Sequence, residues 1–306
     1  MESELAIIGG GPAGFSAAIY AVRSGIKTVV FDKGFGGGLA AVSPNIENYA
    51  GFESISGIDL VEKMKAHASK YTDINFNETV SKVSKKGKEF IIETDKDTYN
   101  VKAVLLCTGT EYRKLNVEGE KELAGKGVSY CATCDGFFFK DKNVAVIGGG
   151  NTALVESVFL KQIGCKNVYL IHRRNQLRAE KAYQDDAIEK GVEIIYETHV
   201  EKILGNEKVD SLELHNVNTD KLSKLPVDGV FVSIGEEPQN AIAKELGCNI
   251  DEKGYVIVDR QQRTSVKGVY AAGDITGGLR QVITACAEGA IAALASTEAL
   301  GKKYPY

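Results

Sequence analysis

The chain has little of several features that mark specialised classes of protein. Its 306 residues include no tryptophan, two methionines, five prolines and six cysteines. Six cysteines in a chain of this length are too few for the disulfide framework of a small secreted protein. The formal net charge of −4 gives no basic excess that would favour nucleic acid or an anionic membrane as a partner. No apolar run approaches the roughly eighteen residues that a membrane span needs, and we expect a cytoplasmic protein that does not bind membranes.

Short apolar runs alternate with helical segments along the chain. The length predicts two domains, each large enough to bury its own core. An apolar run at Leu5–Ile8 ends in glycines, a small-residue helix follows at Ala13–Arg23, and a second apolar run follows at Thr28–Phe31, which predicts a βαβ unit. The plan recurs as a strand at Val144–Ile147, a helix at Thr152–Ile163 and a strand at Val168–Ile171. Further strands are expected at Phe90–Thr94, Tyr99–Val101 and Ala103–Cys107, a hairpin tip at Lys85–Lys88, and a long helix at Gln281–Leu300. The fold class is therefore α/β.

A glycine fingerprint, Gly9-x-Gly11-x-x-Gly14, joins the first strand to the first helix. The first glycine permits a tight turn, the second lets the backbone approach a pyrophosphate, and the third allows close helix packing. Asp32 ends the next strand, where its carboxylate is placed to accept a hydrogen bond from a ribose hydroxyl. A purely structural glycine turn is the alternative. The register of strand, turn, helix and acidic residue favours a dinucleotide site.

The second fingerprint, Gly148-x-Gly150-x-x-Ala153, is followed by positive charge in place of a carboxylate. The next strand ends in His172-Arg173-Arg174, and Arg178 lies four residues later. Arginine binds phosphate oxygens in bidentate fashion, so this half is predicted to bind NADP rather than NAD. The alternative is a basic helix start on a solvated face. A basic helix start is unfavourable, because the helix dipole disfavours cations at a helix N-terminus.

Two nucleotide sites of opposite charge preference predict that the first holds something other than NADP, and FAD is the natural candidate. The run from Gly268 to Asp274 is a short strand that delivers one carboxylate just before a glycine pair and a long helix. Asp274 is placed to bind a ribityl chain. The helix that begins near Arg280 and Gln281 can direct its positive end at a flavin pyrimidine.

A Cys131-x-x-Cys134 pair lies between the two fingerprints. Structural zinc needs four ligands, there is no second CxxC, and His67, His199 and His215 are isolated in the sequence, so no metal site is expected. The pair is predicted to be a redox dithiol, and Asp135 can shuttle its proton if burial raises the pKa of the carboxyl. A turn-forming Asp-Gly is the alternative for Asp135. The single cysteines Cys107, Cys165, Cys248 and Cys286 are expected to be small buried hydrophobes.

These motifs together resemble those of the low-molecular-weight thioredoxin reductases. The matching runs are Gly9 to Gly14, Cys-Ala-Thr-Cys-Asp-Gly-Phe-Phe from Cys131 to Phe138, Gly-Gly-Gly-Asn-Thr-Ala from Gly148 to Ala153, His172 to Lys181, and Ala271 to Ile275. The resemblance runs essentially end to end. The Cys-Ala-Thr-Cys-Asp run is its most specific part, because related ferredoxin reductases share the fingerprints but lack these cysteines.

The resemblance implies two Rossmann-like three-layer domains, with an NADPH domain at residues 115–244 inserted into an FAD domain formed by residues 1–114 and 245–306. It implies a homodimer that reduces thioredoxin or a thioredoxin-like protein. Cys134 matches the flavin-proximal cysteine, Cys131 the cysteine that attacks the substrate, and Asp135 the acid/base. FAD contacts carry over to Gly9, Gly11, Pro12, Ala13, Gly14, Asp32, Lys33, Gly37, Gly38, Leu39, Asn48, Val80, Gly109, Asp274, Arg280, Gln281 and Val282. NADPH contacts carry over to Gly148, Gly150, Asn151, Thr152, Ala153, His172, Arg173, Arg174 and Arg178.

Both the thiol pair and the nicotinamide site are carried by the inserted segment, and both must reach one flavin. We therefore expect the inserted domain to rotate about hinges near Arg113–Val117 and Glu237–Leu246. Three positions depart from the family pattern: Gly38 replaces a glutamine, Ala50 a proline and Val155 a glutamate. Two other functions stay open at this point. One is a related disulfide reductase with another protein partner or electron donor, and the other is a non-enzymatic flavin redox sensor.

Overall fold

The computed structural model describes residues 3–43 and 45–303, which divide into two compact units. The first unit takes the chain up to Glu111 and again from Glu237, and the second is the insertion from Tyr112 to Glu236. The chain passes between them along β8 (Thr110–Tyr112) and β17 (Glu236–Pro238), which pair as a two-stranded ribbon. The predicted fold class, an α/β chain with one domain inserted into another, is confirmed.

The second boundary between the units lies earlier in the chain than the predicted junction of residues 244 and 245. The short helix α6 (Ala241–Glu245) belongs to the first unit. Its Ala243 is 1% exposed, and it packs in the same core as Val83 and Val256. Burial of this helix against the first unit therefore moves the crossing point to β17.

The first unit is built from the two terminal parts of the chain. Its helices and strands are β1 (Leu5–Ile8), α1 (Pro12–Arg23), β2 (Thr28–Asp32), the 3-10 helix η1 (Gly38–Val42), α2 (Gly57–Ala68), β3 (Ile74–Phe76), β4 (Val80–Lys86), β5 (Glu89–Thr94), β6 (Thr98–Val101), β7 (Ala103–Leu106), α6, β18 (Val269–Ala271), the 3-10 helix η3 (Asp274–Thr276) and α7 (Val282–Ala299). The expected hairpin tip lies between β4 and β5, and the long helix expected at Gln281–Leu300 is α7.

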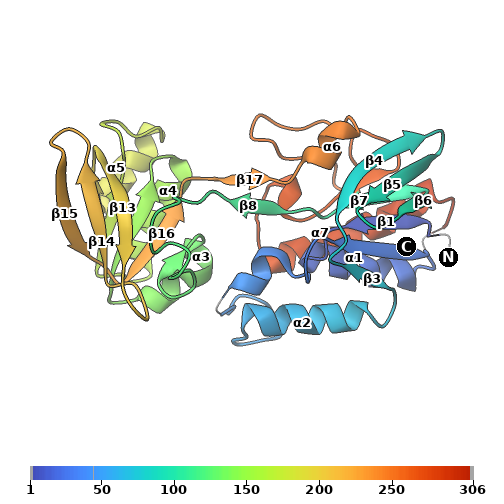
Figure 1. Ribbon diagram of the computed structural model, residues 1–306, viewed down its shortest axis with the longest axis horizontal. Helices are drawn as coiled ribbons and strands as arrows, with labels where there is room; N and C mark the ends of the chain where they lie inside the picture. Colours follow the sequence, from blue (N-terminus) through green and yellow to red (C-terminus); the bar gives the residue numbers. More distant parts are fainter. Residues whose placement is uncertain (1–2, 44, 304–306) are drawn as a thin grey trace. The chain divides into compact units, whose positions relative to one another are not determined.

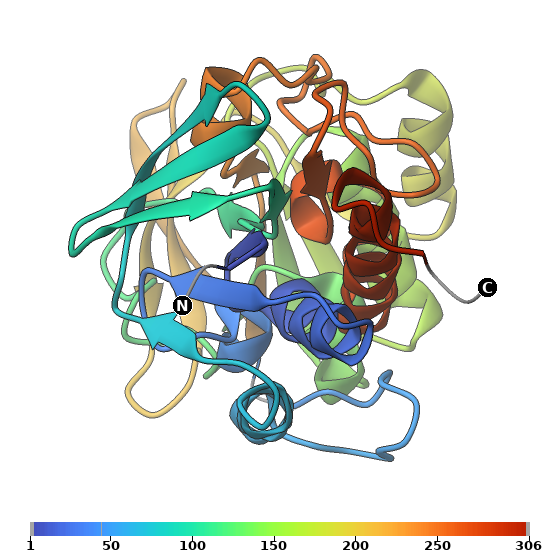
Figure 2. The ribbon, with the colours of Figure 1, turned by 90° about the vertical axis from the view of Figure 1, so that its right-hand side faces the viewer.

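Three layers make up the first unit (Figure 2). The middle layer is a parallel sheet with the strand order β18-β7-β1-β2-β3. Alternate residues of β1 face opposite ways, as the period of a strand requires. Leu5 and Ile7 join the core under α1 and α7, whereas Ala6 and Ile8 join the core under the antiparallel sheet β4-β5-β6. The first fingerprint lies at the end of β1, where the chain leaves this sheet.

Among the described helices, α7 alone has the length and the apolar composition to cross a membrane, with a mean hydropathy of 1.2. The expectation that no run approaches this limit is therefore wrong for α7. Close packing against α1 accounts for its composition of small residues. A Cβ on Gly289 would lie 2.1 Å from the carbonyl oxygen of Ala13, so glycine is required where the two helices meet.

The second unit repeats this construction. Its elements are β9 (Val128–Ser129), α3 (Ala132–Asp135), the 3-10 helix η2 (Gly136–Phe139), β10 (Asn143–Gly148), α4 (Asn151–Gln162), β11 (Asn167–Ile171), α5 (Lys181–Glu189), β12 (Glu193–Ile195), β13 (Thr198–Leu204), β14 (Ser211–Asn216), β15 (Lys221–Pro226) and β16 (Gly229–Ser233). The parallel sheet has the order β12-β11-β10-β16-β9, and β13-β14-β15 form an antiparallel sheet (Figure 1). Val144 and Val146 face the helices α4 and α5, whereas Ala145 and Ile147 face β13 and β14.

Candidate active site

The first fingerprint forms a closed loop with one open position. A Cβ on Gly14 would lie 1.9 Å from the carbonyl oxygen of Gly9, and Gly9 itself has a φ of 112°, so both positions require glycine. A Cβ on Gly11 would meet nothing within 4 Å. Gly11 is the N-cap of α1, which has no side-chain cap and no acidic residue in its first turn. Free N–H groups beside open space are what a pyrophosphate needs, so the residues fit a dinucleotide such as FAD.

Asp32 braces this loop. Its Oδ2 accepts a hydrogen bond from the backbone N–H of Gly10 at 2.8 Å, and its Oδ1 accepts from Gly34 at 2.8 Å and from Gly36 at 3.2 Å. Gly37 N–H donates to the carbonyl of Gly10 at 2.6 Å, which holds the glycine run 36–38 against the fingerprint. The carboxylate therefore shapes the loop, in addition to the ribose contact predicted for it.

The second fingerprint has the same arrangement of closed and open positions. A Cβ on Gly148 would lie 2.4 Å from the carbonyl oxygen of Ser233, whereas a Cβ on Gly150 would meet nothing within 4 Å. Gly150 is the N-cap of α4, again without a side-chain cap. Asn151, the first residue of α4, exchanges two hydrogen bonds of 2.9 Å with Glu180. The loop thus leaves room at the helix N-terminus for a second pyrophosphate.

His172 and the arginines that follow it lie in different environments. The His172 side chain is 6% exposed, and its two ring nitrogens lie 2.8 Å from the carbonyl of Gly148 and 2.9 Å from that of Gln176. Both ring nitrogens lie beside backbone carbonyls, so His172 supports the glycine loop, and its contact with NADPH stays a prediction. Arg173, Arg174 and Arg178 are exposed, and none takes part in an ion pair within residues 3–43 and 45–303. Their guanidinium groups are available to an anionic ligand.

The remaining predicted FAD contacts are spread over the elements and loops of the first unit, and two further predicted NADPH contacts lie at the start of α4 in the second unit. Asn48 donates to the Gln281 side chain at 2.9 Å, and Arg280 donates to the Tyr255 hydroxyl at 2.9 Å. Pro12 and Ala13 open α1, Thr152 and Ala153 lie in the first turn of α4, Leu39 lies in η1, Val80 opens β4 and Val282 opens α7. Lys33 pairs with Glu111 at 2.8 Å on the surface. Gly109, with a φ of 65°, precedes the ribbon strand β8.

Glu288, which no sequence motif indicated, supports the turn that carries Asp274. Its carboxylate accepts from the Gly273 N–H at 2.8 Å and from the Thr276 hydroxyl at 3.3 Å. Burial raises the pKa of the Glu288 carboxyl, and these two donors partly offset that rise. Glu288 belongs to none of the sequence motifs described above, so only the tertiary structure reveals the contact.

Cys131 and Cys134 form a disulfide, with their Cα atoms 5.3 Å apart. Cys131 is the N-cap of α3, and its carbonyl accepts hydrogen bonds from the N–H groups of Cys134 at 3.3 Å and Asp135 at 3.1 Å. A single helical turn thus holds both sulfur atoms and the acidic side chain. Each cysteine is partly exposed. The pair can undergo thiol–disulfide exchange with a partner that reaches it.

The Asp135 carboxyl is poised to hold a proton. One oxygen, Oδ2, accepts from the Ser129 hydroxyl at 2.5 Å, and the other, Oδ1, is buried with no hydrogen-bond partner. Burial raises the pKa of Asp135, and the Ser129 hydrogen bond lowers it by less. Ser129 also accepts from the Cys131 N–H at 3.1 Å. Ser129 therefore links the dithiol backbone to the acid, a role that no sequence pattern indicated.

The single cysteines are poor nucleophiles. Cys107, Cys165 and Cys248 are buried, as expected, whereas Cys286 is partly exposed. Burial raises the pKa of the Cys107 and Cys248 thiols, and it raises the pKa of Cys165 and of Cys286 to about 11. Few thiolates form at these positions at neutral pH, so the chemistry of the chain concentrates at the disulfide.

His199 and His215 are not isolated, contrary to the expectation from the sequence. They face each other across β13 and β14, with Nε2 of His199 3.4 Å from Nδ1 of His215. The pairing depends on the register of two antiparallel strands, which the sequence spacing alone does not show.

Comparison with known proteins agrees with this geometry. Residues 3–289 match the family described as pyridine nucleotide-disulphide oxidoreductase. The chain is 42% identical over 301 residues to the thioredoxin reductase of Helicobacter pylori, covering 95% of this chain and 96% of that protein. It is 38% identical over 305 residues to a Clostridium pasteurianum protein named "34.2 kDa protein in rubredoxin operon", covering 99% and 98%. The crystal structure of thioredoxin reductase from Streptococcus pyogenes superposes with a TM-score of 0.93 at 38% identity, covering 99% of each chain.

Both fingerprints, the helical disulfide and the near-complete coverage therefore agree, and the chain belongs to the pyridine nucleotide-disulphide oxidoreductase family.

Proposed function

We propose that this protein is an NADPH-dependent thioredoxin-disulfide reductase that uses FAD. The observation that carries the proposal is the disulfide of Cys131 and Cys134 in one turn with Asp135, whose Oδ1 is buried and unpartnered. The relatives named thioredoxin reductase support the choice of substrate. A redox sensor would need the disulfide, but it would not need three exposed arginines beside a second nucleotide loop.

We assign FAD to the first unit and NADPH to the second. Asp32, at the end of β2, accepts a hydrogen bond from the loop around Gly11, and its carboxylate disfavours the extra phosphate of NADP. The loop around Gly150 is followed by Arg173, Arg174 and Arg178, which suit a 2′-phosphate. Bound FAD would accept a hydride from NADPH and pass the electron pair to the disulfide.

Reduction of the disulfide breaks one S–S bond and yields two sulfur groups that need protons. Two electrons and two protons convert Cys131 and Cys134 to thiols. The Cys131 thiolate then attacks the substrate disulfide, forms a mixed disulfide and releases one substrate thiolate. The Cys134 thiolate attacks Cys131, which restores the internal disulfide and releases the second substrate thiolate. Asp135, whose pKa is raised by burial, supplies and recovers a proton beside these sulfur atoms.

The partner in this proposal is thioredoxin or a thioredoxin-like protein. Next to the disulfide, Phe137 is 59% exposed and Phe138 is 37% exposed. Exposed aromatic side chains are favourable anchors in protein interfaces, which supports a protein substrate over a small disulfide. We also propose that the protein is a homodimer in the cytoplasm, where thioredoxins keep thiols reduced.

The test is insulin reduction coupled to oxidised thioredoxin, with NADPH as the donor. Cys131→Ser removes the attacking sulfur, so we expect it to lose thioredoxin reduction while NADPH still bleaches the flavin. Cys165→Ser, which changes a buried cysteine outside the pair, is the matched control and should retain activity. Full thioredoxin reduction by Cys131→Ser would refute the assignment of this cysteine.

A further inference from the structure

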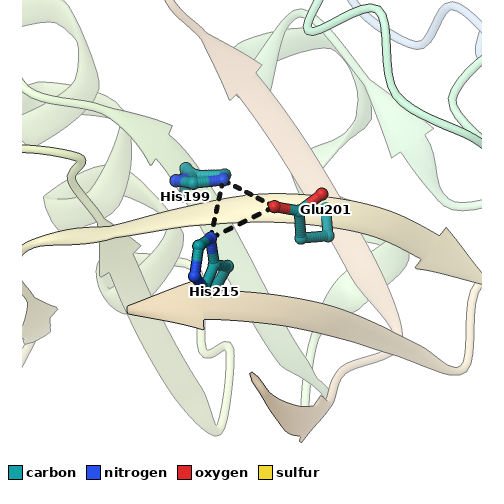
Figure 3. Close-up of side chains that lie close together, drawn as sticks. All are labelled: His199, Glu201 and His215. Carbon is teal, nitrogen blue, oxygen red and sulfur yellow. Dashed lines mark hydrogen bonds and ion pairs between the residues drawn. The ribbon is translucent and has the colours of Figure 1, made fainter. Parts of the chain in front are cut away.

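A compact group of two histidines and a glutamate lies on the antiparallel sheet of the second unit. His199 and Glu201 lie on β13, and His215 lies on β14 directly opposite His199. Figure 3 shows the three side chains turned toward one another. They take no part in the proposed dithiol chemistry, and both histidines are among the four in the chain.

A β-bulge explains how Glu201 reaches the two histidines. The register between β13 and β14 shifts between Val200 and Lys202, which leaves Glu201 as the extra residue. Val200 and Ile203 are three positions apart, yet both are buried in one core, so the residues between them lie on the other face. A bulge of this kind redirects a side chain, and such features are common beside functional sites.

The distances within the group match those of a metal site. Nε2 of His199 lies 2.7 Å from Oε1 of Glu201, Nδ1 of His215 lies 3.3 Å from the same oxygen, and the two ring nitrogens are 3.4 Å apart. In a tetrahedral zinc site, bonds of about 2.0–2.1 Å separate the ligand atoms by about 3.3–3.4 Å. Two of the three separations already have this value. The third would widen by about 0.6 Å, which a small rotation of the exposed Glu201 side chain supplies.

A fourth side chain orients one of the histidines. Nε2 of His215 lies 2.7 Å from Oδ1 of Asp220, and in the tautomer that donates from this nitrogen to the carboxylate, Nδ1 has a lone pair for a metal ion. A carboxylate on the far nitrogen of a histidine is the usual support of a metal ligand. The N–H of His199 is then the one donor among the three converging atoms. A divalent cation that replaces the proton of this N–H would accept a lone pair from each of the three atoms.

We propose that His199, Glu201 and His215 bind a divalent transition-metal ion of the zinc class, with Asp220 as a positioning residue. Two imidazoles and one carboxylate suit zinc and its neighbours, whereas magnesium and calcium prefer oxygen ligands alone. The His199 and Glu201 side chains are each 40% exposed and that of His215 is 23% exposed, so the ion can enter from solvent and keep a water as its fourth ligand. Bound metal would tie β13 to β14.

The test is titration of the oxidised FAD-containing protein with Co²⁺, followed by absorption, and with Zn²⁺ in competition with a chromophoric indicator. The intact disulfide keeps the Cys131 and Cys134 thiolates out of the measurement. We expect one ion per chain. His199→Gln and His215→Gln should each weaken binding by about tenfold or more, and Asp220→Asn should weaken it by about tenfold.

His67→Gln is the matched control, because His67 is an exposed histidine of α2 in the other unit, and it should leave the affinity unchanged. Circular dichroism and flavin content report folding of each variant. If the histidine variants do not fold, Asp220→Asn still decides, because Asp220 is 93% exposed. Absence of binding at micromolar metal would overturn the proposal. Binding equal to that of the wild type would also overturn it, in either folded histidine variant or, where neither of these folds, in Asp220→Asn.

Discussion

Removal of the Ser129 hydroxyl should change the pH at which the dithiol works. The hydroxyl donates to Oδ2 of Asp135 at 2.5 Å, and it contacts the ionised form of the carboxyl more strongly than the neutral form. A hydrogen bond to a charged group contributes about 1.5–3 kcal/mol. Ser129→Ala removes this stabilisation of the ionised carboxylate, so it should raise the pKa of Asp135 further.

The sign of the effect follows from the role of the acid. Activity at high pH falls as Asp135 loses its proton, because the deprotonated carboxylate cannot supply one to the sulfur atoms. A higher pKa keeps Asp135 protonated over a wider range, so Ser129→Ala should move the alkaline limb of the thioredoxin-reduction profile to higher pH. The assay is kcat against pH with thioredoxin as substrate. Ser129→Thr retains a hydroxyl and should keep the wild-type profile. An unmoved alkaline limb in Ser129→Ala would refute the reasoning.

Three further predictions concern the nucleotide loops and the buried acid. Arg174→Ala should raise KM for NADPH by about tenfold to a hundredfold, because it removes a charge-assisted contact with the 2′-phosphate. KM for NADH should stay unchanged, and equal effects on both KM values would contradict the assignment of Arg174 to that phosphate. Gly11→Ala should fold but hold less FAD, because its Cβ would occupy the open space left for the pyrophosphate. Gly14→Ala should lower the melting temperature, because its Cβ would lie 1.9 Å from a carbonyl oxygen. Circular dichroism and flavin content separate the two effects, and equal folding defects in both variants would count against a pyrophosphate site at Gly11. Because burial raises the folded-state pKa of Asp135 above its unfolded value, ionisation at neutral pH opposes folding and protonation at lower pH removes that cost. Asp135→Asn should therefore raise the melting temperature at pH 7, with a smaller gain near pH 4, and a gain that does not shrink in acid would argue against this cause.

Local sequence patterns predicted the parts of the site that depend on neighbouring residues. The strand, glycine turn and helix around Gly11 and Gly150 were predicted because each residue of those runs has a local conformational reason. The long helix α7 and the hairpin tip near Gly87 were predicted for the same reason. The CxxC disulfide follows from two cysteines within one helical turn.

The parts that were missed depend on contacts between side chains and backbone of different helices and strands. Glu288 reaches Gly273 from the next helix, and Ser129 reaches Asp135 from a strand end. The pairing of His199 with His215 needs the register of two strands and the bulge that places Glu201. The contacts of His172 with the carbonyls of Gly148 and Gln176 likewise depend on the fold around it. Sequence spacing contains none of this information.

The most direct test of the central claim is an anaerobic titration of the purified FAD-containing protein, followed by flavin absorbance. We expect NADPH to bleach the flavin rapidly and NADH at the same concentration not to bleach it. Oxidised thioredoxin should then restore the colour. Failure of NADPH to bleach the flavin would contradict the assignment of Arg173, Arg174 and Arg178. Bleaching that thioredoxin cannot reverse would contradict the path through Cys131 and Cys134.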